Sequence, residues 1–201
     1  MKNSAIHCLA PTNGDITVIK LGGSLAHSDN LRYCLDSIEQ RYQGRAVVIV
    51  PGGGAFADQV RLAQQRWQFD DGTAHAMALL AMQQMALLFN GLKPHFVMAG
   101  SVAQIRQQLL LKKIVIWSPD VAELEQAGIQ ASWDVTSDSL AVWLADSLSA
   151  SELLLIKSAD IDANLSLVEL AERDIIDKAF CDSVAHVTFP ITLINALHFN
   201  G

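Results

Sequence analysis

The stretch that decides the fold is ITVIKLGGS, residues 16–24. Its first six residues are apolar except for Thr17 and Lys20, and two glycines and a serine follow at once. A short β-branched run that ends in glycine is typical of a buried strand leading into a tight turn. A second unit of the same kind is AVVIVPGGGAFAD, residues 46–58. The sequence therefore predicts two strands, at 16–21 and 46–50, that each end in a glycine-rich turn.

Helices and strands alternate along the rest of the chain. Apolar residues recur at helical spacing in segments 29–42, 56–63, 73–90, 102–110 and 137–147, and shorter helices are expected at 119–128 and 167–173. Further short apolar runs predict strands at 96–99, 114–117, 153–156 and 191–194. Such alternation is typical of a mostly parallel sheet covered on both faces. We expect a loose leader at residues 1–14 and a single α/β domain at 15–201.

Composition and charge narrow the class of protein. Of the 201 residues, 51% are hydrophobic and 17% charged, which allows a large core and argues against disorder. The net charge of -7 argues against a nucleic-acid surface, although a small anionic ligand remains possible. Cys8, Cys34 and Cys181 are widely spaced, which favours a reducing cytoplasm over a disulfide framework. No apolar stretch is long enough to predict a membrane span, so we expect a cytoplasmic protein.

The two glycine-rich turns are candidate phosphate sites. In an open parallel sheet, ligands bind at the carboxyl ends of the strands, where both turns lie. Glycine lets the backbone approach a ligand closely, so that successive N–H groups converge on an anion. The residues concerned are Gly22, Gly23 and Ser24 in the first turn and Gly52, Gly53 and Gly54 in the second. The alternative is that both are ordinary tight turns between a strand and a helix.

Lys20, Lys157 and Asp138 are candidate charged groups of the same site. Lys20 and Lys157 each end an apolar strand, where an ammonium group is costly unless it reaches an anion or a carboxylate. Beside a phosphate such a lysine neutralises charge on a phosphoryl group in transfer. Asp138 would hold the lysines, or a magnesium ion between them. The alternatives are lysines that extend to solvent and an aspartate that merely favours the first turn of a helix.

Three rival motifs fit less well. Residues 52–57 satisfy the looser dinucleotide pattern GxGxxA, but Asp70 and Asp71, near the expected distance, follow a helix rather than a strand. The P-loop pattern GxxxxGK[ST] does not occur in the sequence. Residues 22–26 approach the nucleophile elbow GxSxG but lack its closing glycine. A nicotinamide dehydrogenase therefore remains a remote alternative, and a hydrolase is disfavoured.

Taken together and in this order, these motifs resemble the amino acid kinase superfamily, which includes acetylglutamate, aspartate, uridylate and isopentenyl phosphate kinases. The resemblance rests on KLGGS at 20–24, GGG at 52–54, TSDSLA at 136–141 and LLLIKSADID at 153–162, and it covers nearly the whole chain after residue 14. It implies a three-layer α/β/α sandwich with a mostly parallel central sheet. It also implies in-line transfer of the γ-phosphoryl group of ATP, with Mg²⁺, and no covalent enzyme intermediate.

The resemblance assigns roles to single residues. Lys20 would touch the transferred phosphoryl group, Asp138 would organise the lysines, and Lys157 would stand in for a second catalytic lysine. The residues implied for ATP phosphate are Gly22, Gly23, Ser24, Asp160 and Asp162, and those implied for the acceptor are Gly52, Gly53, Gly54 and His75. His75 begins a methionine-rich helix like that of the branch that includes the aminomethylfuran phosphate kinase of methanofuran biosynthesis. Several superfamily members form dimers or dimers of dimers, so a homo-oligomer is expected.

The sequence departs from the family pattern in its nucleotide half. The usual Asp-Val-Asp-Gly-Val turn appears as DIDAN at 160–164, without its glycine, and the segment after Lys157 is short. We therefore expect an ATP-dependent phosphotransferase that acts on a small anionic acceptor, such as a phosphomonoester in the biosynthesis of a C1-carrier cofactor. The alternative is a non-catalytic or regulatory module that binds a nucleotide or anion on the same fold.

Overall fold

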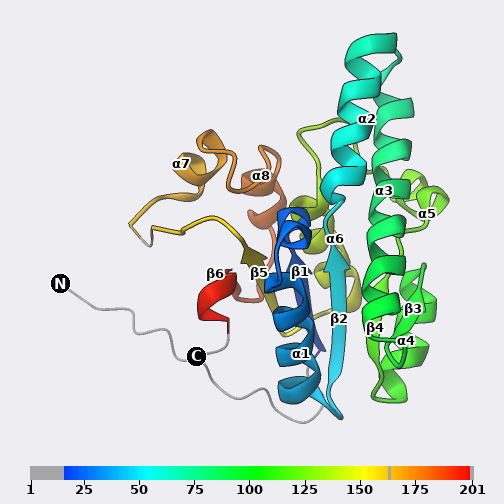
Figure 1. Cartoon of the computed structure of the whole chain (residues 1–201), viewed down its shortest axis with the longest axis vertical. Coiled ribbons are helices and arrows are strands. Elements are labelled where there is room, and N and C mark those ends of the chain that lie inside the picture. The colour runs from blue at the N-terminus through cyan, green and yellow to red at the C-terminus, as the bar shows by residue number, and fades with distance from the viewer. Residues whose placement is uncertain (1–15, 163, 200–201) are drawn as a thin grey trace.

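A computed structural model describes residues 16–162 and 164–199, and the leader expected at 1–14 lies outside these residues. The described chain forms a six-stranded sheet with helices on both faces (Figure 1). The strands run in the order β3-β4-β2-β1-β5-β6, and every neighbouring pair is parallel. The expected three-layer α/β/α architecture is thus confirmed.

The strands and helices lie close to their expected positions. The strands are β1 (Ile16–Leu21), β2 (Ala46–Pro51), β3 (Val97–Ala99), β4 (Ile114–Trp117), β5 (Glu152–Lys157) and β6 (Ile191–Asn195). The α-helices are α1 (Asn30–Tyr42), α2 (Gly54–Trp67), α3 (Asp71–Leu92), α4 (Val102–Leu110), α5 (Val121–Gln126), α6 (Ser137–Leu148), α7 (Leu167–Glu172) and α8 (Phe180–Val184). Two 3₁₀-helices, η1 (Gly23–His27) and η2 (Ala196–His198), complete the described elements.

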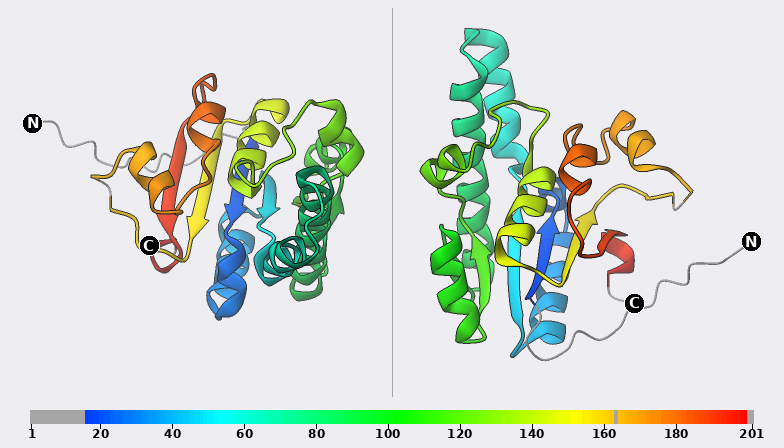
Figure 2. Two further views of the ribbon diagram at one scale, coloured as in Figure 1. Left: turned by 90° about the horizontal axis from the view of Figure 1, so that it is seen from above. Right: turned by 180° about the vertical axis from the view of Figure 1, so that it is seen from behind.

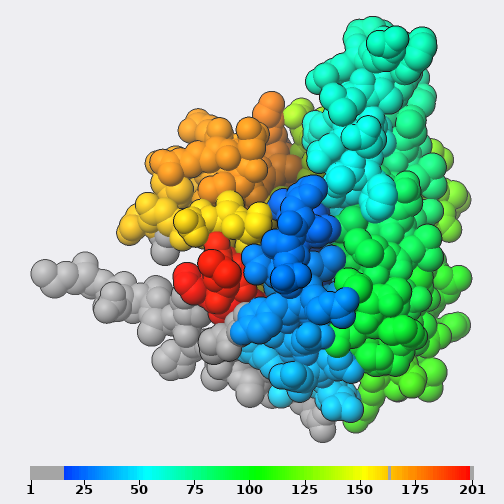
Figure 3. All heavy atoms as spheres, viewed as in Figure 1, coloured from blue at the N-terminus to red at the C-terminus, as the bar shows by residue number. Residues whose placement is uncertain are grey.

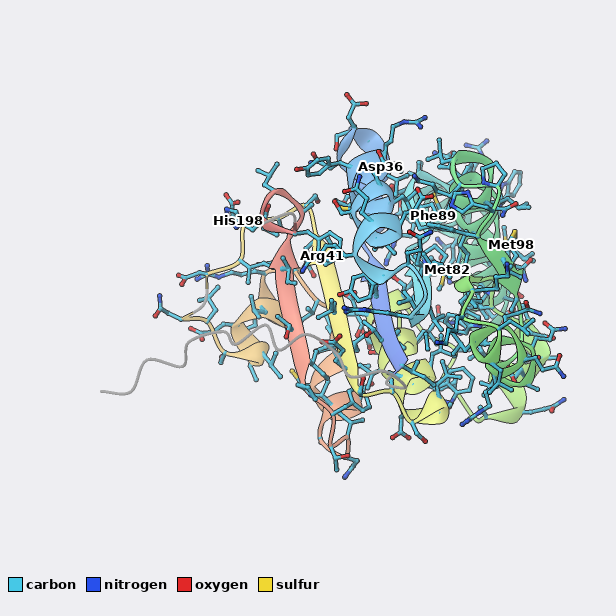
Figure 4. The ribbon with its side chains drawn as sticks, turned by 90° about the horizontal axis from the view of Figure 1, so that it is seen from below. Asp36, Arg41, Met82, Phe89, Met98 and His198 are labelled. Carbon is cyan, nitrogen blue, oxygen red and sulfur yellow. The ribbon has the colours of Figure 1, made fainter. Side chains whose placement is uncertain are left out.

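Helices cover both faces of the sheet (Figure 2), and an apolar core lies on each face. One face packs mainly against α4, α6 and α8, and the other against α1 and the second half of α3. Helix α3 joins the two: Met82 belongs to the first core and Phe89, two turns later, to the second (Figure 4). Because both faces of the central strands are buried, the sequences of these strands are almost entirely apolar.

The chain beyond β6 is tied back to α1. The guanidinium of Arg41 donates to the carbonyl oxygen of Phe199 over 2.7 Å and lies 5.6 Å from the centre of its ring. This contact fixes the last described residues against the α1 face of the sheet.

The structure differs from expectation in two respects: it contains short helices that were not predicted, and helices α2 and α3 are longer than predicted. Helices η1 and α8 were not predicted, because segments of five residues are too short to show a helical period. Helices α2 and α3 are each longer than expected, and together they project beyond the sheet (Figures 1 and 3). None of the described helices is both long and apolar enough to cross a membrane.

Candidate active site

A cavity of about 540 Å³ lies at the carboxyl ends of β1, β2 and β5. Both glycine-rich turns, the first turn of α6, residues 133–136 and residues 174–178 line it. In Figure 3 the surface is hollowed here, between α2 and the α7–α8 segment. Strand β1 has β2 on one side and β5 on the other, so the chain changes direction across the sheet at this point. Ligands bind at such switch points in open parallel sheets.

The two glycine-rich turns pack directly against each other. A Cβ atom built on Gly23 would lie 2.3 Å from the backbone nitrogen of Gly54, and one on Gly52 would lie 2.5 Å from that of Gly23. The turns are held by the strands, since Gly22 N donates to Ile156 O and Gly52 N donates to Leu21 O, each over 2.9 Å. The sequence prediction of two adjoining turns at one edge of the sheet is thus confirmed. A side chain on either contact glycine would separate them.

Strand alternation brings Lys20 and Lys157 to the same place. Residues 18 and 20 of β1 and residues 153, 155 and 157 of β5 share one face, because successive side chains on a strand point to opposite faces. That face carries α6, whose first turn contains Asp138. Lys20 Nζ lies 2.8 Å from Asp138 Oδ1, and Lys157 Nζ lies 2.5 Å from Asp138 Oδ2. One carboxylate therefore holds both ammonium groups.

This triad is buried, and its protonation reflects both burial and charge. Lys20 and Asp138 are each 4% exposed and Lys157 9%. Burial favours a raised pKa for the Asp138 carboxyl, but the ammonium groups of Lys20 and Lys157 outweigh it and lower the pKa below its ordinary value. Burial and the neighbouring Lys20 charge lower the pKa of Lys157 to about 8, against the opposing effect of Asp138. The triad carries a net positive charge, which suits an anionic ligand.

Asp177 fixes the first turn of α6, a role that the sequence did not predict. Thr136 is the N-cap residue, but its side chain caps no backbone group of the helix. Instead Asp177 Oδ2 accepts hydrogen bonds from Thr136 N and Thr136 Oγ1, each 2.8 Å, and from Ser139 N at 3.0 Å. Asp177 Oδ1 accepts from Ser139 Oγ at 2.5 Å. No local pattern could reveal a cap that is supplied by a distant segment.

Arg61 and Trp133 also line the cavity, and neither was predicted as a site residue. The Arg61 guanidinium lies 3.8 Å from the centre of the Trp133 ring, whose Nε1 donates to Gln64 Oε1 over 2.6 Å. Among residues 16–162 and 164–199, no carboxylate lies within ion-pair distance of Arg61. This cation is held in place by an aromatic ring and remains available to an anion.

His75 also lines the cavity, close to the loop that carries Trp133. Burial lowers the pKa of its imidazole below the ordinary value, and a hydrogen bond to the backbone of Ser132 acts in the opposite direction. The ring is therefore mainly neutral at pH 7 and offers hydrogen bonds rather than charge.

The Ser24 and Ser158 hydroxyls, 2.7 Å apart, join the first glycine turn to the end of β5.

Asp160 and Asp162 do not line the cavity, in contrast to the other expected site residues. Both are exposed. Asp160 Oδ1 accepts a hydrogen bond from Asn195 Nδ2 at 3.2 Å, and Asp162 Oδ1 accepts from Asn164 N at 2.9 Å. Their assignment to ATP phosphate remains a prediction.

The described residues also contain no group of three side chains able to hold a metal ion. Of the two partners proposed for Asp138, lysine and magnesium, the lysines occupy both of its oxygens.

The chain is similar to known proteins both in sequence and in structure. The model of the amino acid kinase family matches residues 15–173. A curated relative from Methanocaldococcus jannaschii, [5-(aminomethyl)furan-3-yl]methyl phosphate kinase, is 23% identical over 145 residues, which make up 71% of this chain and 66% of that protein.

Solved structures share the fold at low sequence identity. The uridylate kinase of Archaeoglobus fulgidus superposes with a TM-score of 0.68 at 15% identity, and the match covers 90% of each chain. The UMP kinase of Ureaplasma parvum gives a TM-score of 0.69 at 16% identity, covering 92% of each chain. The UMP kinase of Bacillus anthracis gives 0.65 at 18% identity, covering 93% of this chain and 89% of that one.

Proposed function

Because the chain belongs to the amino acid kinase family, we propose that it transfers the γ-phosphoryl group of ATP to a small anionic acceptor. The single observation that carries this proposal is the buried Lys20–Asp138–Lys157 triad beside two interlocked glycine turns. Apart from Gly22 and Gly52, whose N–H groups bond to the strands, the glycines offer backbone N–H groups without side chains, and the triad offers two ammonium groups at fixed positions. Such an arrangement suits a group that carries several negative charges.

The chemistry asked of the chain is mainly electrostatic. An acceptor oxygen forms a bond to the γ-phosphorus while the bond from that phosphorus to the oxygen bridging the β-phosphate breaks, which leaves ADP and a phosphorylated acceptor. Lys20 neutralises charge that builds up on the transferred group, and Lys157 does the same from the neighbouring strand. Asp138 holds the two ammonium groups apart and in place. No residue of the chain needs to form a covalent bond.

The residues present fit ATP phosphates better than they fit a metal ion. In the first turn, Gly22 and Gly23 present bare backbone to the cavity beside Ser24, and a Cβ atom on Gly23 would meet the backbone of Gly54. Asp138 is occupied by lysines, and no other carboxylate set for a metal ion exists among the described residues. We propose that Mg²⁺ is held mostly by phosphate oxygens and water, as is common at kinase sites. When bound, it would neutralise phosphate charge.

On the acceptor side we assign Gly52, Gly53 and Gly54, as the sequence suggested, with His75. Arg61 is added because its guanidinium lines the cavity without a carboxylate partner among the described residues. An acceptor that already carries a phosphate would pair with Arg61 and present its own phosphate oxygen to the transferred group. The relative from M. jannaschii is named for such a substrate, a furanylmethyl phosphate. We propose a phosphomonoester of this kind, in the biosynthesis of a C1-carrier cofactor.

The test is ATP turnover with a panel of phosphomonoesters and carboxylates, comparing the wild type with Lys20→Ala. We expect a phosphomonoester to be phosphorylated and Lys20→Ala to lower kcat by about 10²–10³-fold. The matched control is Lys113→Ala, because Lys113 is exposed and lies outside the cavity. An acceptor turned over equally by wild type and Lys20→Ala would contradict the role of Lys20.

A second candidate function is a binding or regulatory module on the same fold. The observation that favours it is the position of Asp160 and Asp162 outside the cavity, in a turn that lacks the family's glycine. Calorimetry with a non-hydrolysable ATP analogue and Mg²⁺ separates the two. Binding together with turnover supports the kinase, binding without turnover on any acceptor supports the module, and no binding at millimolar nucleotide contradicts the kinase.

We further propose that the protein is a cytoplasmic homo-oligomer. Leu80, Leu87 and Leu88 are exposed along α3, and a second copy would cover them. The free thiols of Cys34 and Cys181 suit a reducing compartment. Light scattering of the wild type and of Leu87→Glu tests the assembly: a wild-type monomer contradicts it.

A further inference from the structure

We infer that Asp177 is a positioning residue for phosphoryl transfer, because it holds the helix turn that places Asp138 between Lys20 and Lys157. The inference rests on the proposed function. It concerns a residue from the C-terminal segment that no sequence motif singled out.

The contacts of Asp177 are concentrated on one turn. Both carboxylate oxygens accept hydrogen bonds, and all four bonds come from Thr136 and Ser139. Two of the donors are backbone N–H groups at the start of α6, where a helix has no internal partners for them. Asp177 therefore acts as the N-cap acceptor of α6, although it lies 38 positions beyond Ser139 in the chain.

Asp138 lies between the two residues that Asp177 holds. Its carboxylate meets the two lysines of the sheet, whereas the hydroxyls of Thr136 and Ser139 donate to Asp177. The segment of Asp177 is itself fixed against this turn, since Ala179 N donates to Asp134 O over 3.0 Å. Loss of the Asp177 carboxylate would leave the Thr136 and Ser139 N–H groups without partners and release the turn. Asp138 would then no longer be held at a fixed distance from both lysines.

Positioning of this kind predicts an effect on the triad and not only on folding. If Asp138 moves away from Lys157, the lysine loses the carboxylate that favours its charged form, and it gives up its proton at lower pH. A small displacement of a charge that acts on the transferred group also costs turnover, by about tenfold to a hundredfold. A cap that served stability alone would change neither the titration of Lys157 nor kcat per folded molecule.

The chain offers a matched control. Asp120 caps α5 with its carboxylate, accepting from Ala122 N at 2.9 Å and Glu123 N at 3.4 Å, and it does not line the cavity. Asp120→Ala removes an aspartate cap as Asp177→Ala does, but away from the triad. We expect both variants to unfold at lower urea concentration than the wild type, and only Asp177→Ala to affect Lys157.

The experiment is an NMR titration of lysine side chains, labelled with ¹³C at Cε, in the full-length protein, with Lys157→Arg used to assign the Lys157 signal. We expect Asp177→Ala to lower the pKa of Lys157 by about one unit or more, with Asp177→Asn intermediate and Asp120→Ala unchanged. An unchanged Lys157 titration in folded Asp177→Ala overturns the inference. If that variant does not fold, the Lys157 titration is measured in Asp177→Asn and in the double variant Thr136→Val, Ser139→Ala. An unchanged Lys157 titration in these variants likewise overturns the inference. Because this readout needs no turnover, failure to find a phosphate acceptor would count against the proposed function alone.

Discussion

Gly23 and Gly52 lie so close that a Cβ atom on Gly52 would stand 2.5 Å from the backbone nitrogen of Gly23. The contact is backbone to backbone, so neither side can yield by turning a side chain. It joins the turn after β1 to the turn after β2, so the two glycine motifs form one continuous surface. The glycines are thus required by their neighbours as well as by any ligand.

Substitution of Gly23 by alanine is expected to disrupt this surface. The added Cβ would lie 2.3 Å from Gly54 N, and relief requires the backbone to shift, at a cost of about 1–3 kcal/mol in the free energy of unfolding. Binding of an ATP analogue should fall as well. Urea unfolding and calorimetry measure the two effects.

Gly91→Ala is the control for this prediction. Nothing lies within 4 Å of a Cβ built on Gly91, near the end of α3. Because alanine favours the helix, this variant should be more stable by about 0.5 kcal/mol and should bind the analogue normally. A Gly23→Ala protein with wild-type stability and binding would contradict the role given to the contact.

Asp138→Asn should be strongly destabilising. The substitution leaves two buried ammonium groups facing each other without their carboxylate, and breaking a buried ion pair in this way costs about 3–5 kcal/mol. Urea unfolding at pH 7 checks the value. The comparison is Asp134→Asn, which removes the partner of Lys178 from a pair at 3.7 Å whose side chains are 61% and 73% exposed, and should cost about 1 kcal/mol or less. Equal losses in the two variants would be incompatible with a buried triad.

The fold could be predicted because its signals are local. Apolar runs that end in glycine marked β1 and β2, and helical spacing marked α1 and α3, so alternation alone indicated a parallel sheet with two covered faces. Lys20 and Lys157 were identified for the same reason, since a lysine that ends an apolar strand conflicts with its surroundings. Helix α8 escaped because five residues show no period.

The remainder of the site depends on contacts between distant segments. Asp177 contacts α6 although β5 and α7 lie between them in the chain. The ring of Trp133 contacts Arg61 although five elements, α3 to α5, lie between them in the chain. Neither pair has a spacing rule, because tertiary packing and not the local chain brings the partners together. Asp160 and Asp162 show the converse, because their motif is local but neither residue lines the cavity.

Activity should fall as the pH rises through about 8. Lys157 acts as a cation, and its pKa of about 8 means that it loses its proton above that value. Stability responds in the opposite direction. Between pH 8 and the ordinary lysine value near 10.5, the unfolded chain binds the proton and the folded chain does not, so the contribution of Lys157 to the free energy of unfolding rises with pH.

Steady-state kcat and urea unfolding across pH 6.5 to about 10 measure both trends. Lys157→Arg is the control, because a guanidinium keeps its proton throughout this range. Whatever turnover this variant retains should show no decline near pH 8. Superimposable profiles for wild type and Lys157→Arg would assign the decline to another group.

Arg61→Gln should weaken binding of the acceptor and leave the transfer step nearly intact. The Arg61 guanidinium lies on the Trp133 ring at the cavity wall and comes from α2, whereas β1, α6 and β5 supply the Lys20–Asp138–Lys157 triad. A charged hydrogen bond to an acceptor phosphate is worth about 1.5–3 kcal/mol, so KM for a phosphomonoester should rise by about 10–100-fold. The KM for ATP and kcat should change little. Arg66→Gln is the matched control, because Arg66 lies on the same helix, stacks at 5.3 Å on Trp67 and does not line the cavity. If Arg61→Gln lowered kcat and left the acceptor KM unchanged, Arg61 would belong to the transfer step and the acceptor phosphate would have to bind elsewhere.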